Sequence, residues 1–327
     1  MSTPDASRPA PPEGPPAPAP AATIRTPRAY AGLVARGYAM GAADVVPGVS
    51  GGTMAFILGI YEELLLAISA FTRRETLQLI ATLQWRGALR ILPWRFLLAL
   101  GTGIALAVLS LARFLEWALE THPERVWSFF FGLVLASVWV IGRQVRWRGA
   151  SIAGAVLAGV LAWWIVGMVP TQTPDTPLLL VLSGALAICA MILPGISGSF
   201  ILVLLGKYQT VLAAVNDRDL LTIALVGIGA VVGLVSFARI VSWIFRTHHN
   251  AAVATITGLL LGSLRKIWPW KETLEWTLDR HGARVPLMQE NVLPAGWTPE
   301  LGIALALMAV GFAVVWLMER QAGQQTA

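Results

Sequence analysis

The pattern Pro-Gly-x-Ser-Gly occurs twice in this chain, at residues 47–51 and again at 194–198. Proline ends a helix because it has no N–H group to donate, and glycine allows unusual dihedral angles and close approach of a ligand. A helix that restarts after such a turn points unpaired N–H groups and its positive dipole end into the turn. Because N–H groups beside serine hydroxyls favour an anion, especially a phosphate, the sequence predicts two phosphate-binding turns.

We expect hydroxyl and backbone groups of the two turns to bind a substrate phosphate, while the Pro-Gly pairs shape the chain. The predicted phosphate-binding residues of the turns are Ser50, Gly51, Gly52, Thr53, Ser197, Gly198 and Ser199. The predicted structural residues are Pro47, Gly48, Pro194 and Gly195. The alternative is that the turns only let neighbouring helices pack closely. Two matched copies favour the binding interpretation.

Two arginines, Arg113 and Arg239, lie inside apolar stretches. An arginine at the centre of a bilayer costs about 2.5–3.5 kcal/mol on insertion scales, and such residues usually have a partner or ligand. Each of the two shares a helix face with a serine, a tryptophan and a threonine at matched spacings. We expect both guanidiniums to bind one anionic headgroup through charge-assisted hydrogen bonds. The alternative is that each side chain extends to the membrane surface.

Acidic residues flank only the first turn, where Asp44 precedes it and Glu62 and Glu63 follow it. The second copy has Met191 in place of Asp44, so the copies differ at this point. A carboxylate inside a membrane can relay protons, and we expect these residues to couple transport to a gradient of protons or sodium ions. The alternative is a carboxylate that caps backbone groups or pairs with Arg36.

The composition is that of a membrane protein. Hydrophobic residues make up 56% of the chain and charged residues only 13%, with a mean hydropathy of +0.67, whereas soluble domains carry about 25% charged residues. The basic residues behind the net charge of +6 lie between apolar stretches, which is typical of the positive-inside rule and not of a nucleic-acid-binding face. The single cysteine, Cys189, excludes an internal disulfide and a thiolate metal cluster. We predict no metal and no cofactor.

The chain divides into a Pro/Ala-rich tail over residues 1–27, expected to be disordered, and a single transmembrane domain over residues 28–320. Two longer linkers interrupt this domain. Residues 72–95 alternate basic and apolar groups and predict an interfacial segment, and residues 265–299 predict an external loop. The expected helices cover the apolar stretches at about 31–46, 52–70, 96–119, 126–142, 150–169, 177–193, 199–215, 219–245, 250–264 and 300–318.

The chain contains an internal repeat, with copies at about 30–142 and 177–268. A constant offset in residue number pairs Pro47 with Pro194, and a smaller offset in residue number pairs Arg113 with Arg239. Each copy is interpreted as a re-entrant helical hairpin followed by two transmembrane helices. Three crossings separate the copies, so they have opposite orientation, as in transporters with inverted repeats. The predicted fold is therefore an all-α integral membrane protein with two inverted repeats and additional spanning helices.

The distribution of charge orients this topology with both termini in the cytoplasm. The loop at residues 169–177 has no lysine or arginine and is placed outside, whereas Arg265, Lys266 and Lys271 are also placed outside and fit poorly. The basic residues placed in the cytoplasm are Arg25, Arg28, Arg36, Arg73, Arg74, Arg86, Arg90, Arg143, Arg146, Arg148 and Arg246.

The segments DVVPGVSGGTMAFILGIYEELL (residues 44–65) and LPGISGSFILVLLGKYQ (residues 193–209) resemble the polyprenyl-phosphate transporter family of prokaryotic membranes. The resemblance covers about residues 30–320. It implies a flippase in the bacterial cytoplasmic membrane that returns undecaprenyl phosphate from the outer to the cytoplasmic leaflet for cell-wall synthesis. The phosphate-binding positions implied by the resemblance are the two Pro-Gly-x-Ser-Gly turns.

Two other functions use the same residues. A transporter of another anionic substrate needs the same turns but no lateral opening for a lipid. The pattern Gly-x-Ser-Gly is typical of an intramembrane serine protease, but the serine of such an enzyme needs a base nearby. The four histidines lie at expected helix ends or in loops, at His122, His248, His249 and His281. No Gly-rich nucleotide loop occurs, so ATP is not expected to drive transport, and we do not expect an enzyme.

Overall fold

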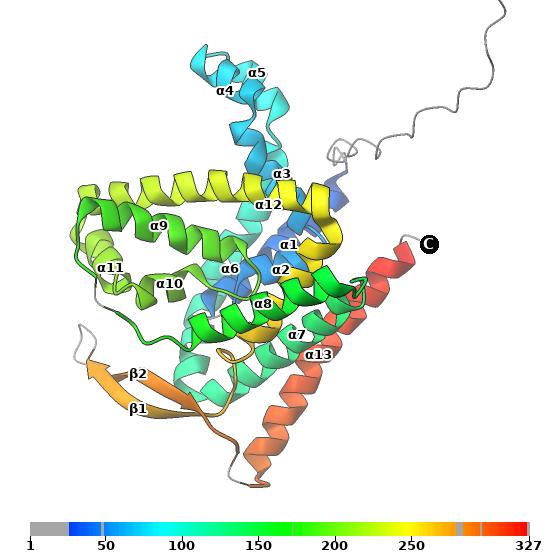
Figure 1. The fold of residues 1–327 in the computed structure, drawn as a ribbon, viewed down its shortest axis with the longest axis vertical. Coiled ribbons are helices and arrows are strands. Elements are labelled where there is room, and N and C mark those ends of the chain that lie inside the picture. The colour runs from blue at the N-terminus through cyan, green and yellow to red at the C-terminus, as the bar shows by residue number, and fades with distance from the viewer. Residues whose placement is uncertain (1–25, 47–48, 172, 279–283, 295, 326–327) are drawn as a thin grey trace, which may run out of the picture.

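The computed structural model describes residues 26–46, 49–171, 173–278, 284–294 and 296–325. Pro47 and Gly48 of the first turn, and residues 1–25 of the predicted tail, therefore lie outside the described residues. The chain is mainly helical (Figure 1). The helices of its first half are α1 (Pro27–Val45), α2 (Gly51–Ile57), α3 (Tyr61–Ser69), a 3-10 turn (Ala70–Thr72), α4 (Arg74–Ala81), α5 (Trp85–Ile91), α6 (Trp94–Thr121) and α7 (Pro123–Gly142). The remaining elements are α8 (Gly149–Val166), α9 (Pro177–Ile192), α10 (Gly198–Leu204), α11 (Tyr208–Asp217), α12 (Leu220–Ser263), β1 (Lys271–Leu278), β2 (Arg284–Asn291) and α13 (Pro299–Gln325).

Among the described residues, five helices are long and apolar enough to cross a membrane: α6, α7, α8, α12 and α13. Two further candidates are bent pairs of short helices. The pair α2 and α3 bends by 118°, and the pair α10 and α11 bends by 105°. The chain is thus a multi-pass membrane protein, with up to seven spans if each bent pair counts as one.

The long helices pack in pairs through glycines. Helix α1 packs on α6, and α9 packs on the first half of α12. A side chain on Gly103 would collide with the carbonyl of Val34, and one on Gly229 would collide with the carbonyl of Val181. Small residues let two helix backbones approach closely in a membrane, so the two helix pairs use matched glycines for the same packing.

In each copy of the repeat, a histidine with non-helical backbone angles separates two long helices. His122 ends α6 with φ −140° and ψ 54°, and His248 breaks α12 with φ −137° and ψ 48°. The sequence predicts two stretches at 219–245 and 250–264, and the break at His248 separates them within α12. Thr121 donates to the Trp117 carbonyl at 2.7 Å, and Thr247 donates to the Trp243 carbonyl at 2.8 Å. The local geometry therefore follows the internal repeat found in the sequence.

The bends inside the short-helix pairs lie at the Leu-Gly-x-Tyr part of each repeat. Gly59 and Gly206 both have φ 69°, a left-handed conformation that glycine adopts without a steric penalty and that commonly ends helices. This Leu-Gly-x-Tyr sequence occurs in both copies of the repeat, at Leu58–Tyr61 and Leu205–Tyr208. It ends α2 and α10 after seven residues each.

The polar connection predicted as an external loop contains a two-stranded antiparallel sheet. Strands β1 and β2 pair from Lys271 opposite Asn291 to Leu278 opposite Arg284. Trp268 donates to the Val292 carbonyl at 2.9 Å and fixes the base of the hairpin. The linker at 72–95 forms α4 and α5, which extend away from the other helices (Figure 1).

Candidate functional site

The structure brings the two Pro-Gly-x-Ser-Gly turns into direct contact. The backbone N–H of Gly195 donates to Thr53 Oγ1 at 2.9 Å. In return, Ser50 Oγ donates to the Met191 carbonyl at 3.1 Å, and Tyr61 donates to the Ile192 carbonyl at 3.1 Å. Segments about 140 residues apart in sequence therefore meet at one interface, which includes the predicted residues Ser50, Thr53 and Gly195.

The polar groups of the first turn are used within the protein. The Asp44 carboxylate accepts a hydrogen bond from the Gly51 N–H at 2.6 Å, and Ser50 Oγ accepts one from the Gly52 N–H at 3.1 Å. Ser50 and Thr53 are each only 1% exposed. Asp44 thus caps the start of α2, and the N–H groups predicted to face a ligand here already have acceptors. Its role in coupling stays a prediction.

The second turn keeps more of its polar groups accessible. Ser197 and Ser199 hydroxyls lie 2.7 Å apart, and Ser197 also accepts from the Phe200 N–H at 3.3 Å. Ser199 is exposed. Gly198 corresponds to Gly51 in the repeat, yet within the described residues no acceptor pairs with its N–H, because Met191 replaces the aspartate.

Two of the glycines and prolines predicted to shape the turns are tightly enclosed. Gly195 has φ 96°, and a Cβ at this position would lie 2.9 Å from Ser263 Oγ on α12. Pro194 is fully buried. The second turn is therefore seated on the end of α12, and only glycine fits at position 195.

Among the described residues, no hydrogen bond joins the paired arginines to the turns. Arg113 on α6 and Arg239 on α12 are both exposed, and neither forms a hydrogen bond or an ion pair in the part of the chain that the structure describes. Ser110, on the predicted face with Arg113, bonds Tyr38 on α1 at 3.1 Å. The role of the arginines in binding phosphate stays a prediction.

Glu62, after the first turn, lines a polar cavity of about 650 Å³ between α1, α7, α12 and α13. Glu62 lies 3.0 Å from the Nε2 atom of His249. Arg36 and Glu319 also line this cavity. Glu63 is partly buried on α3. The cavity gathers ionisable groups of both signs beside the first turn.

A buried lysine that our reading of the sequence missed fixes the base of the second hairpin. Lys207 lies between α10 and α11 and is fully buried. Its ammonium donates to the carbonyls of Thr173 and Pro174 at 2.5 and 2.8 Å and pairs with Asp175 at 2.5 Å. The signal in the sequence was a lysine where the first copy has Ile60. Its partners could not be found from spacing.

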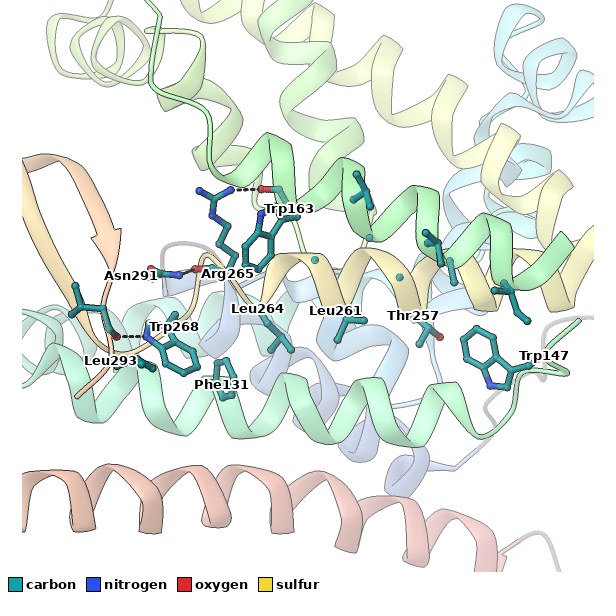
Figure 2. A pocket seen from close by; sticks show the side chains of 18 residues that line it. Phe131, Trp147, Trp163, Thr257, Leu261, Leu264, Arg265, Trp268, Asn291 and Leu293 are labelled. Carbon is teal, nitrogen blue, oxygen red and sulfur yellow. Dashed lines mark hydrogen bonds between the residues drawn. The ribbon is translucent and has the colours of Figure 1, made fainter. Parts of the chain in front are cut away.

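A long apolar groove of about 870 Å³ runs between α7, α8, the second half of α12 and the residues after β2 (Figure 2). At one end, Arg265 donates to the Trp163 carbonyl at 3.0 Å. The Trp268 ring lies there too, 5.4 Å from Phe131. At the other end lies Trp147. The groove has the dimensions and lining of a site for an apolar chain.

The described residues give no support to the serine-protease alternative. Neither Ser50 nor Ser197 contacts a histidine, since their hydroxyls bond Met191, Gly52, Ser199 and Phe200. No group of three His, Cys, Asp or Glu side chains that could hold a metal ion occurs among the residues described.

Comparison with known proteins identifies similar sequences over most of the chain. The sequence model of the undecaprenyl phosphate translocase-like family matches residues 40–285. A polyprenyl-phosphate transporter of Vibrio cholerae is 43% identical over 305 residues, which cover 90% of this chain and 97% of the relative. A polyprenyl-phosphate transporter of Staphylococcus aureus is 32% identical over 257 residues, which cover 72% of this chain and 85% of the relative. No solved structure matches the chain.

Proposed function

The chain belongs to the undecaprenyl phosphate translocase-like family, and we propose that it moves polyprenyl phosphate across the bacterial cytoplasmic membrane with the phosphate held at the second turn. The direction is from the outer to the cytoplasmic leaflet, which recycles the carrier of cell-wall synthesis. The phosphate must pass through hydrocarbon, whereas the prenyl chain can stay in lipid. A transporter of this kind performs no chemical step on its substrate.

The repeats are inverted, and each contributes a re-entrant hairpin. Helices α2 and α10 have seven residues each, or roughly 10 Å at 1.5 Å per residue, so neither can cross a hydrocarbon core of about 30 Å. The bends of 118° and 105° then turn the chain aside. Irregular backbone at membrane depth is tolerated where it is buried in protein or lines a cavity, and the contact between the turns supplies that shelter. Both termini are cytoplasmic.

The observation that carries the phosphate assignment is the difference between the two turns. The Asp44 carboxylate accepts a hydrogen bond from the Gly51 N–H, while the matching Gly198 N–H has no such acceptor in the described part of the chain. The first turn thus contains its own anion, and the second turn offers Ser197, Ser199 and backbone N–H groups to an external one. Arg113 and Arg239 supply positive charge from α6 and α12.

Removing the two hydroxyls of the second turn is expected to reduce lipid transport at least tenfold, because even one lost hydrogen bond to a charged group costs about 1.5–3 kcal/mol. The double variant Ser197→Ala, Ser199→Ala and the single variant Arg239→Ala are compared with the native chain in proteoliposomes that contain fluorescent polyprenyl phosphate. Ser69→Ala is the matched control, since that hydroxyl bonds only its own helix. Native transport rates in both test variants would refute the site.

Asp44 couples transport to the ion gradient, which is carried by protons or sodium ions. The Asp44→Asn variant is expected to keep the cap on Gly51, because the amide oxygen can still accept that hydrogen bond. It is also expected to lose the dependence of transport on an imposed gradient, because an amide carries no titratable charge. The measurement is transport with and without a pH or sodium gradient, with Glu75→Gln on α4 as the control. An unchanged gradient dependence would contradict the role.

A further inference from the structure

Lys266, between α12 and β1, and Lys271, the first residue of β1, have ammonium groups that face aromatic rings instead of carboxylates. Lys266 Nζ lies 4.6 Å from the ring centroid of Phe200, and Lys271 Nζ lies 4.9 Å from that of Trp127. Lys271 Nζ also donates to the backbone carbonyl of Lys266 at 2.6 Å, so the two lysines are in direct contact. Within the described residues, neither ammonium has an ion-pair partner.

The two lysines differ in this respect from Lys207, which pairs with Asp175 and two carbonyls. Burial lowers the pKa of Lys266. Burial and, to a smaller extent, the charge of Lys266 lower the pKa of Lys271 to about 7. A cation over an aromatic ring is attracted by the ring's electrons, but the ring does not neutralise the charge. A desolvated cation without a counter-charge is costly, and an anion between the two ammonium groups would remove that cost.

The lysine pair lies beside the second turn. Phe200, under the Lys266 ammonium, is in the first turn of α10, and its N–H donates to Ser197 Oγ. Ser263, against which Gly195 packs, accepts a hydrogen bond at its carbonyl from the Lys266 N–H at 2.8 Å. Lys266 therefore adjoins the turn that we assign to phosphate, through Phe200 at its ammonium and through Ser263, which packs against Gly195, at its backbone.

The lysine pair also adjoins one end of the apolar groove. Arg265 and Trp268, which line the groove, flank Lys266 in sequence (Figure 2). Trp268 contacts Phe131 on α7, one helical turn after Trp127, the residue under Lys271. A cationic cluster at the end of an apolar groove is complementary to a molecule with an anionic head and a hydrocarbon chain.

We propose that Lys266 and Lys271 form a receiving site that binds the phosphate of a polyprenyl phosphate, with the adjoining prenyl units in the apolar groove, before the phosphate passes to the second turn. This site rests on the proposed function, because the substrate is the same lipid. It differs from the second turn in its residues, its charge and its groove, so variants of the two sites have separate expected results.

The test is equilibrium binding of radiolabelled undecaprenyl phosphate to the full chain in nanodiscs. The double variant Lys266→Met, Lys271→Met is expected to bind at least tenfold more weakly, and its melting temperature is expected to be unchanged or higher because two costly charges are gone. Arg74→Met removes one positive charge from α4, remote from the groove (Figure 1), and is expected to bind like the native chain.

Three further ligands identify which part of the lipid is recognised. Undecaprenol, without phosphate, is expected to bind the native chain and the double lysine variant equally, and inorganic phosphate is expected to compete only weakly. Val156→Trp, which fills the groove, is expected to weaken the binding of both prenyl lipids. Phosphatidylglycerol is expected not to compete, and its competition at equal concentration would show a general lipid site and overturn the proposal.

The outcome also separates this site from the proposed function. Native affinity in the double lysine variant overturns the receiving site, whatever the transport assay gives. If the double serine variant of the second turn still loses transport in that case, the proposed function stands without the lysine site. If the native chain neither binds nor flips the lipid, both proposals fall together.

Discussion

The Met191→Asp variant is expected to lose lipid transport at least tenfold while remaining folded. Met191 occupies the position that Asp44 has in the first copy, and its Cβ lies 3.4 Å from where a Cβ on residue 198 would lie. A carboxylate here can accept from the Gly198 N–H as Asp44 accepts from Gly51. An intramolecular group competes at a high effective concentration, and its negative charge repels the phosphate of the lipid.

The measurement for this variant combines flipping in proteoliposomes with thermal melting. Met191→Asn is the matched comparison, because its amide oxygen can also accept from the Gly198 N–H but carries no charge, and its transport is expected to fall between that of the native chain and that of Met191→Asp. Met191→Leu should transport like the native chain. The melting temperature of the aspartate variant should not fall, since a new cap at a helix start is stabilising by about 1 kcal/mol. Rapid flipping by Met191→Asp would refute phosphate binding at the second turn.

The Asp175→Ala variant is expected to destabilise the protein by about 1–3 kcal/mol, because a buried ammonium would lose its only carboxylate. The Lys207 side chain is 1% exposed, whereas that of Asp175 is 57% exposed. Their Coulomb attraction is therefore screened on one side, and the cost arises mainly from the unpaired lysine. Thr173 donates to the Leu205 carbonyl at 2.7 Å in the same contact, so the loop before α9 loosens from the second hairpin.

Thermal melting of three variants distinguishes this explanation from a general effect of mutating the loop. Asp175→Asn keeps an oxygen acceptor and should fall between the native chain and Asp175→Ala. Lys207→Met removes the buried charge itself and should cost less than Asp175→Ala, because an apolar side chain of similar length needs no partner. Equal melting temperatures for Asp175→Ala and the native chain would contradict the assigned role of Lys207.

The positions of the helices could be predicted from the sequence because long apolar stretches are a local property. The stretch at 96–119 became α6 (Trp94–Thr121), and the stretch at 300–318 became part of α13. The β-hairpin was missed. Leu274 and Trp276 alternate with polar residues in β1, but the many charged residues of this segment made an external loop seem the simpler interpretation. The bends at Gly59 and Gly206 were encoded in a motif whose role we did not derive.

The sequence by itself determined the membrane class, the duplication and the residue types of both turns, since composition and repetition need no knowledge of distance. Only the tertiary structure decided how those turns are used. The bond from Gly195 to Thr53 joins residues 142 positions apart, and Lys266 reaches Phe200 from a connection that seemed merely external. Hydrogen-bond acceptors are assigned by packing between distant segments. For that reason the difference between a capped first turn and an accessible second turn emerges only after folding.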